Sequence, residues 1–389
     1  MELSLQEKKR RLSKVHNLIT EMNADACILT STVNQYWMCG IVFDGYLYIE
    51  PEKEPLFFVR RPVGWEHENS IKIRKPEQIP ELLLDKGEKV PKHILIENDS
   101  LSYNTSKRLQ LAFNAKIINN ISGDIRKIRS IKSDFELNQM RESAKIHSLI
   151  YDMIPSLYRP GMTDLELQIE IERQMRLHGS IGIFSTFGDN MNIFMGSILT
   201  GNNAQNASPF DFALGGKGIT PLLPLGANNT LLKPGNTVMV DMAGNFRPYM
   251  DDMSRTFAVE YAPDSAYKLH QVSIQIHRAI SEVAKAGISC HEIYFIAEEI
   301  VKKNKVDPYF MGTTQQAKFI GHGVGLEINE PPVITPNSKE KLETGTAFAL
   351  EPKFVLPDIG AVGIENTYIV HNNGIENITI CEEEIVILK

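Results

Sequence analysis

The residues best suited to carry chemistry are four carboxylates and one imidazole in the C-terminal half of the chain. Each lies at the edge of an apolar run typical of a β-strand, where a bare charge would be costly to bury. Two divalent cations would neutralise such a cluster, and oxygen ligands with one nitrogen suit Mn, Co, Fe or Zn. Five unrelated surface residues at strand ends are the alternative, which explains any one of them more easily than all five together. The candidate ligands are Asp241, Asp252, His322, Glu351 and Glu365.

The first two carboxylates are expected to meet on a pair of antiparallel strands. Asp241 closes the apolar run of residues 237–241, and Asp252 lies eleven positions further along the chain. The intervening residues 244–248 (Gly-Asn-Phe-Arg-Pro) are typical of a turn. An antiparallel pair joined by a loop can bring both carboxylates to one place. Asp251 should face away from Asp252, because successive side chains of a strand alternate between its faces.

Composition and charge limit the class of protein. The chain has 389 residues, of which 42% are hydrophobic and 23% charged, so two globular domains are expected. A net charge of -7 without a basic block argues against nucleic-acid binding. No apolar span is long enough for a transmembrane helix, and the charged N-terminus does not resemble a signal peptide. Four scattered cysteines without metal-binding spacing predict reduced thiols and a cytoplasmic location.

The chain is expected to divide near residue 128. Residues 1–128 begin with a helix over about 4–23 and continue with short apolar runs, which predicts a small α/β domain with a mixed sheet and no evident catalytic group. Residues 129–389 form the second domain, and Ser133 and Glu136 fit a capping box that opens a long helix. An irregular segment, residues 187–235, is rich in Gly, Asn and Pro, and loops this long are commonly functional.

A short pattern recurs within the second domain. Gly, Thr and Glu at positions 161, 163 and 166 correspond to Gly, Ser and Glu at 287, 289 and 292, a constant offset of 126. Each copy starts a helix and precedes one of the strand pairs that bear the carboxylates. This predicts an internal duplication, in which two α+β halves each donate a pair of carboxylates to a shared centre.

The sequence around the candidate ligands resembles the pita-bread metallopeptidases, which include methionine aminopeptidase, Xaa-Pro aminopeptidase and prolidase. The resemblance extends to the N-terminal domain, which looks like a creatinase-type domain with residues 34–40 at their usual place. The motifs that carry it span residues 240–244, 252–256, 321–332, 351–352 and 363–367.

This resemblance implies an α+β pita-bread domain behind a creatinase-like N-terminal domain, and a homodimer. It also implies that Asp241 binds one metal ion, that His322 and Glu351 hold a second, and that Asp252 and Glu365 bridge the pair. Two such ions would turn a shared water into a hydroxide nucleophile near neutral pH. Glu351 would then carry the proton to the leaving nitrogen. Ser254 and Arg255 are expected to orient Asp252.

The substrate residues depart from the family pattern. Phe210 and Asn329 stand where the peptidases usually carry histidines, and Lys318 and Asp211 are the other candidate substrate contacts. Groups aimed at a peptide carbonyl are worth roughly 10²–10³ in rate each. The first interpretation is therefore an Xaa-Pro peptidase with replaced donors, acting on short peptides. The alternative is a non-peptidase hydrolase or lyase that uses the same metal scaffold on a small amide, amidine, lactam or sulfonium compound.

Overall fold

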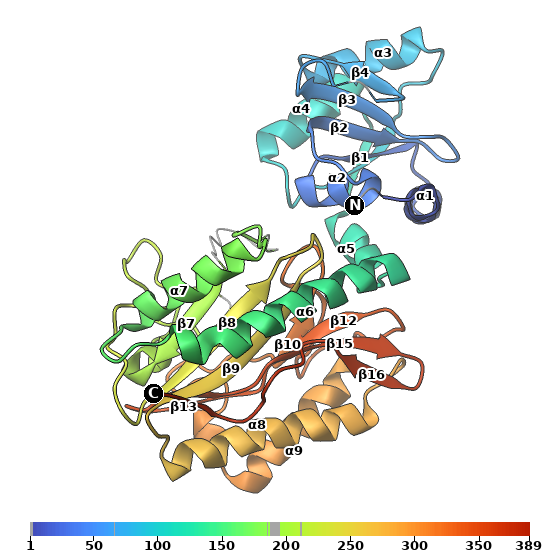
Figure 1. Cartoon of the computed structure of the whole chain (residues 1–389). Helices are drawn as coiled ribbons and strands as arrows, with labels where there is room; N and C mark the ends of the chain where they lie inside the picture. Colours follow the sequence, from blue (N-terminus) through green and yellow to red (C-terminus); the bar gives the residue numbers. More distant parts are fainter. Residues whose placement is uncertain (1–2, 66, 185, 187–194, 211) are drawn as a thin grey trace. The chain divides into compact units, whose positions relative to one another are not determined.

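A computed structural model describes residues 3–65, 67–184, 186, 195–210 and 212–389 (Figure 1). The chain separates into two compact units, residues 1–129 and 130–389, each with its own core. Among the described residues no helix is long and apolar enough to cross a membrane. All four cysteines are free thiols.

The first unit is built on a six-stranded mixed sheet in the order β4-β3-β2-β1-β5-β6. β1 pairs antiparallel with β2 and parallel with β5, so the expected mixed sheet is present. The sequence patterns did not predict α2, β4 or α5, whose ranges are given below. The elements are α1 (Leu5–Glu21), β1 (Ala26–Leu29), α2 (Thr32–Cys39), β2 (Asp44–Ile49), β3 (Leu56–Arg61), β4 (Ser70–Lys72), η1 (Pro76–Gln78), α3 (Ile79–Asp85), β5 (His93–Ile96), α4 (Tyr103–Phe113), β6 (Ile117–Asn120) and α5 (Ser122–Ser130).

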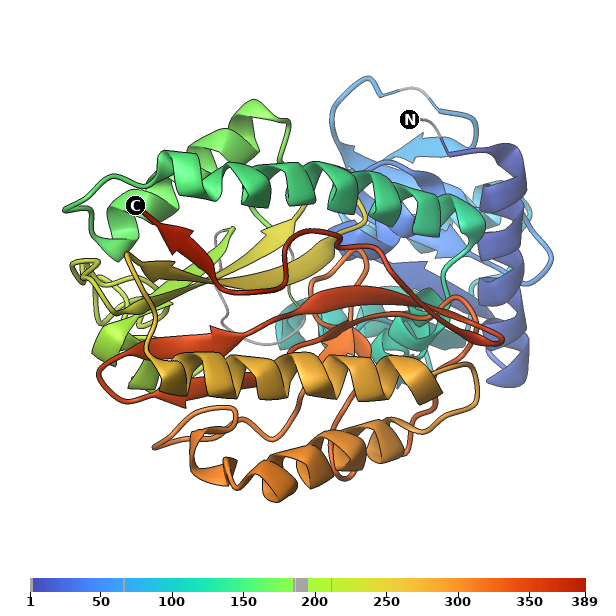
Figure 2. The same ribbon diagram turned by 60° about the horizontal axis from the view of Figure 1, so that its bottom comes forward.

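The second unit begins with two helices that cover one face of a four-stranded sheet, ordered β17-β9-β8-β7 (Figures 1 and 2). Apolar side chains of both helices pack against β7, β8 and β9 in one core cluster. β7 lies inside the segment that the sequence predicted to be irregular, and it pairs with β8 as an edge strand. The elements are α6 (Asp134–Leu157), α7 (Asp164–Leu177), β7 (Gly196–Thr200), η2 (Gly201–Gln205), β8 (Thr237–Gly244), β9 (Asp251–Val259) and β17 (Val386–Leu388).

The other half of this unit repeats the arrangement with a five-stranded sheet, ordered β11-β10-β12-β15-β16, and the two-stranded β13-β14. α8 packs on β13, β14 and β16, and α9 packs outside α8 (Figure 2). The elements are α8 (Asp264–Val283), α9 (Cys290–Asn304), η3 (Asp307–Tyr309), β10 (Gly321–Gly323), β11 (Glu330–Val333), β12 (Ala347–Leu350), β13 (Lys353–Leu356), β14 (Gly360–Gly363), β15 (Asn366–His371) and β16 (Gly374–Asn377).

The two helix pairs begin in the same way. Thr163 caps α7 and Ser289 caps α9, and in each case a glutamate three residues later closes a capping box. Gly161 and Gly287 both have a positive φ, which only glycine adopts without strain. The local geometry therefore agrees with the sequence pattern that predicts a duplicated domain.

Candidate metal centre

The β8–β9 hairpin places the first two carboxylates on one face. Asp241 lies opposite Ser254, and Asp252 lies opposite Ala243. Residues directly opposite share a face of the sheet, and side chains along one strand alternate, so Asp241 and Asp252 point to the same side as diagonal neighbours. Asp251 faces the other way, where its Oδ2 lies 2.7 Å from Nδ1 of the buried His147.

The other three candidate ligands come from the second half of the domain. His322 lies on β10 opposite Ala349 of β12, and Glu351 directly follows β12. Glu365 lies between β14 and β15, and its backbone N–H donates to the carbonyl of Ser254 on the hairpin. This bridge helps to join the two halves at the centre of the site.

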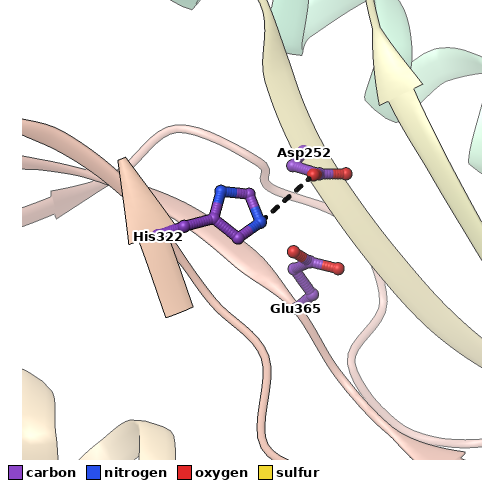
Figure 3. Close-up of side chains that lie close together, drawn as sticks. All are labelled: Asp252, His322 and Glu365. Atoms are coloured by element: carbon purple, nitrogen blue, oxygen red, sulfur yellow. Dashed lines mark ion pairs between the residues drawn. The ribbon is translucent and has the colours of Figure 1, made fainter. Parts of the chain in front are cut away.

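The five side chains form two groups of three that share one carboxylate. One group is Asp252, His322 and Glu365, shown in Figure 3, and the other is Asp241, Glu351 and Glu365; in each, ligand atoms lie within 4.8 Å of one another. His322 Nε2 is 3.9 Å from Asp252 Oδ2 and 3.5 Å from Glu351 Oε1. Carboxylate oxygens around one imidazole nitrogen fit a divalent cation of the transition series.

His322 is held in a form that can bind metal. Its Nδ1 lies 3.1 Å from the carbonyl oxygen of Gly323, which can only accept a hydrogen bond, so Nδ1 carries the proton and the lone pair of Nε2 faces the carboxylates. Burial lowers the pKa of His322 and favours the neutral ring, and the negative charge of Glu365 only partly opposes this.

A lysine lies at the centre of the second group of carboxylates. The prediction from the sequence did not include it. The side chain of Lys353 is fully buried, and its ammonium lies 2.8 Å from Asp241 Oδ2, 2.7 Å from Glu351 Oε2 and 3.0 Å from Glu365 Oε2. A signal was present, because Lys353 opens the short buried strand β13, whose other residues are all apolar. A lysine two positions after a candidate ligand, within an apolar run, indicates a buried ion pair.

The electrostatics of the site follow from burial of like charges. Without a bound cation, burial and the neighbouring Glu351 raise the pKa of Glu365 to about 8. Burial and the charge of Glu365 likewise raise the pKa of Asp252 well above its usual value. Burial alone would lower the pKa of Lys353, but Asp241 and Glu351 outweigh it and hold that pKa well above the usual value. The cluster therefore needs positive charge, and Lys353 supplies only part of it.

The expectation that Ser254 and Arg255 orient Asp252 is wrong. Ser254 Oγ donates to Glu365 Oε2 at 2.7 Å, and Arg255 donates to the Glu365 carbonyl and to Asn366 Oδ1. Asp252 is instead fixed through its backbone, which exchanges two hydrogen bonds of 2.8 Å with the hydroxyl of Thr367. The pairing of the hairpin with the segment around Glu365 decides these partners, and that pairing is remote in sequence.

All five candidate ligands line one pocket. Asn329, a predicted substrate residue, also lines this pocket, whereas Phe210 and Lys318 line a neighbouring cavity that shares some of its walls. Asp211 lies outside the described residues. The remaining pocket walls are mostly apolar and include Phe184, Phe212, Ala213, Leu225, Ala243, Phe319, Ile328 and Val333.

Comparisons with known proteins agree with this geometry. A family model described as metallopeptidase family M24 matches residues 138–372, and one described as the creatinase/prolidase N-terminal domain matches residues 11–131. An Xaa-Pro dipeptidase of Pyrococcus furiosus is 24% identical over 385 residues, covering 97% of this chain and 100% of the relative.

Solved structures of similar proteins show the fold. An Xaa-Pro dipeptidase from Bacillus anthracis superposes with a TM-score of 0.80 at 24% identity, covering 98% of this chain and 100% of that one. A prolidase from Pyrococcus horikoshii gives a TM-score of 0.78 at 22% identity, with coverage of 97% and 100%. These likenesses confirm the expected α+β pita-bread fold with a creatinase-like N-terminal domain.

Proposed function

Because the chain belongs to metallopeptidase family M24, we propose that it hydrolyses the Xaa-Pro bond of short peptides with the help of a bound divalent metal ion. The observation that carries this proposal is the convergence of all five candidate ligands on one pocket. Asp252, His322 and Glu365 would hold the ion. When bound there, it would activate a water molecule and polarise the substrate carbonyl.

Glu351 is the residue placed to move the proton. Its Oε1 faces His322 at 3.5 Å, while its Oε2 accepts from Lys353 at 2.7 Å. One carboxylate oxygen is thus anchored, and the other faces the side of the site where the ion would lie. Glu351 takes the proton of the attacking water and passes it to the leaving nitrogen.

The pocket supports a small, largely apolar substrate. Aromatic and aliphatic side chains form most of its walls, which suits a proline ring and an uncharged neighbouring side chain. Asn329 and Ser197 are polar wall residues, and we assign Asn329 to contact the carbonyl or a terminus of the substrate. Phe210 and Lys318 line the neighbouring cavity and then do not contact the substrate directly. They affect specificity only through the wall residues that the two cavities share. Asp211 stays a predicted substrate contact.

The relatives support a peptidase rather than a non-peptidase hydrolase or lyase. The proteins from Pyrococcus furiosus, Bacillus anthracis and Pyrococcus horikoshii are Xaa-Pro dipeptidases and a prolidase, and they match this chain over nearly its whole length. The ion would be Mn, Co, Fe or Zn, since the ligand set does not discriminate among them. We further propose that the protein is a homodimer, which the family resemblance supports. We also propose that it is cytoplasmic, which the four free cysteines support.

The test is hydrolysis of a panel of Xaa-Pro dipeptides by protein that has been stripped of metal and reloaded with Mn²⁺ or Co²⁺. Wild-type protein should cleave peptides with an apolar Xaa, and Glu351→Gln should lose this cleavage while it still binds metal. Glu298→Gln, which removes a partly exposed carboxylate on α9 that pairs with Lys302, is the matched control and should behave as wild type. Folded, metallated wild-type protein that cleaves no Xaa-Pro bond would contradict the proposal.

A further inference from the structure

Lys353 occupies the place that a second metal ion would need. A divalent ion bound by Asp241, Glu351 and Glu365 would lie at the centre of their oxygens, about 2.0–2.2 Å from each. The ammonium of Lys353 already lies between the same three carboxylates and bonds one oxygen of each. An ammonium has three donors, so these contacts use all of them.

We propose that Lys353 is a built-in replacement for one of the two metal ions that the sequence motifs imply, so that the protein binds a single divalent ion per chain. That ion binds at Asp252, His322 and Glu365, where among the described residues no lysine or arginine pairs with Asp252 or His322. The inference refines the metal centre of the proposed function and rests on it for this remaining ion.

The backbone around Lys353 holds the lysine in place. Its N–H and carbonyl both bond Met311, and it pairs with Gly363 across β13 and β14. The carbonyl of the preceding Pro352 accepts from Ser273 Oγ at 2.7 Å. The strand is buried along its whole length, so its backbone pairing fixes the point from which the lysine side chain extends. A metal ion would have to replace all three charge-assisted hydrogen bonds of the ammonium.

Repulsion between cations favours the same conclusion. One ammonium and one divalent ion leave the four carboxylates with one net negative charge, whereas two divalent ions beside the ammonium would leave one net positive charge. A second divalent ion would lie against the ammonium, and because the Lys353 side chain is fully buried, solvent and salt would screen their repulsion weakly. Lys353 supplies charge but no coordination position, so the bridging hydroxide expected from the motifs has no second ion to bind.

The experiment counts bound metal and does not require activity. The full chain is stripped of metal with a chelator and titrated with Mn²⁺ or Co²⁺ in a calorimeter. The protein is then desalted, and the metal that stays bound is quantified by elemental mass spectrometry. We expect one equivalent for the wild type and two for Lys353→Met, which keeps a similar stem without the charge. Lys132→Met removes another buried lysine, paired with Glu330 at 3.1 Å, and should remain at one equivalent.

The outcomes separate this inference from the proposed function. Two tightly bound equivalents in the wild type would overturn the inference and leave a metallopeptidase intact. No bound metal in folded wild-type protein would overturn both. A folded Lys353→Met that stays at one equivalent would show that the lysine is not what excludes the second ion. If Lys353→Met does not fold, the anomalous signal of Mn in wild-type crystals decides: one peak between Asp252, His322 and Glu365 supports the inference, and a second peak beside Asp241 refutes it.

Discussion

The two halves of the acidic centre share Glu365 but meet their need for positive charge differently. Around Asp241 and Glu351, the charge is a lysine side chain that the fold itself delivers. Around Asp252, a neutral imidazole leaves room for an exchangeable ion. Similar carboxylate clusters can thus become either a permanent ion pair or a metal site, and the group that reaches them decides which.

The shared carboxylate ties the two halves together. Glu365 receives hydrogen bonds from Lys353 at 3.0 Å and from Ser254 at 2.7 Å, both on Oε2, which leaves Oε1 for the His322 side. A change on the lysine side should therefore act mainly on charge and stability. A change on the histidine side should act on metal binding.

The largest effect is expected from His322→Ala. Loss of the nitrogen ligand should weaken metal binding by more than about 100-fold, since even partners outside the coordination shell cost 10–100-fold. Asp241→Asn, in the lysine half, should retain its equivalent of metal. Metal titration of both stripped proteins gives the comparison. Equal loss in the two variants would mean that the two halves do not differ in how they obtain positive charge.

A smaller loss is expected from Ser254→Ala, which removes a hydrogen bond to the shared carboxylate. Affinity for the ion should fall about 10–100-fold. Ser148→Ala is the matched control, because this buried hydroxyl in α6 has no hydrogen-bond partner among the described residues. Calorimetric titration with Mn²⁺ measures both. An unchanged affinity in Ser254→Ala would show that Glu365 is positioned by Lys353 and the backbone alone.

Asp251 and Asp252 are adjacent in sequence, but Asp251 makes a structural contact whereas Asp252 is a candidate metal ligand. Asp251→Asn disturbs the fully buried contact with His147 on the opposite face of the hairpin and should cost about 1–3 kcal/mol of unfolding free energy. Asp251→Asn should still bind one metal ion per chain, whereas Asp252→Asn should lose its metal. Urea unfolding and metal analysis of the two variants test this. Metal loss in Asp251→Asn without loss of stability would contradict the alternation of faces.

Much of this arrangement could be predicted from the sequence because it depends on local patterns. The turn-prone residues 244–248 predicted the β8–β9 hairpin, and alternation placed Asp251 away from Asp252. The capping boxes at Ser133, Thr163 and Ser289 predicted where three helices begin. Each of these signals lies within a few residues of the structure that it determines.

The contacts that the sequence did not reveal are remote ones. Ser254 was assigned to Asp252, two residues away, but it bonds Glu365, more than a hundred residues further on. Lys353 was overlooked because the ligand motif ends at Pro352, and the pairing of β13 with β14 turns its side chain towards Asp241. β7 was missed because its five residues lie in a stretch rich in Gly and Asn, and pairing with β8 stabilises it.

The smallest effect concerns an ion pair at the surface, which is the opposite limit from Lys353. Arg141 donates to both oxygens of Glu376 at 2.8 and 2.6 Å, with each side chain 35% exposed. Hydrogen bonds from Arg141 lower the pKa of Glu376 from 4.5 to about 2. Because the folded pKa is depressed, the pair stabilises fully above pH 4.5 and its contribution is lost as the pH falls towards 2.

After allowance for screening by solvent, Glu376→Gln should cost about 0.5–1 kcal/mol at pH 7, and the difference from wild type should shrink at pH 3.5 and in high salt. The destabilisation of metal-free Lys353→Met should respond less to salt, because Glu351 and Glu365 are buried and only Asp241 is partly exposed. Urea unfolding in low and high salt measures both variants. A salt response in Lys353→Met as large as that in Glu376→Gln would show that the lysine half of the centre is open to solvent and ions.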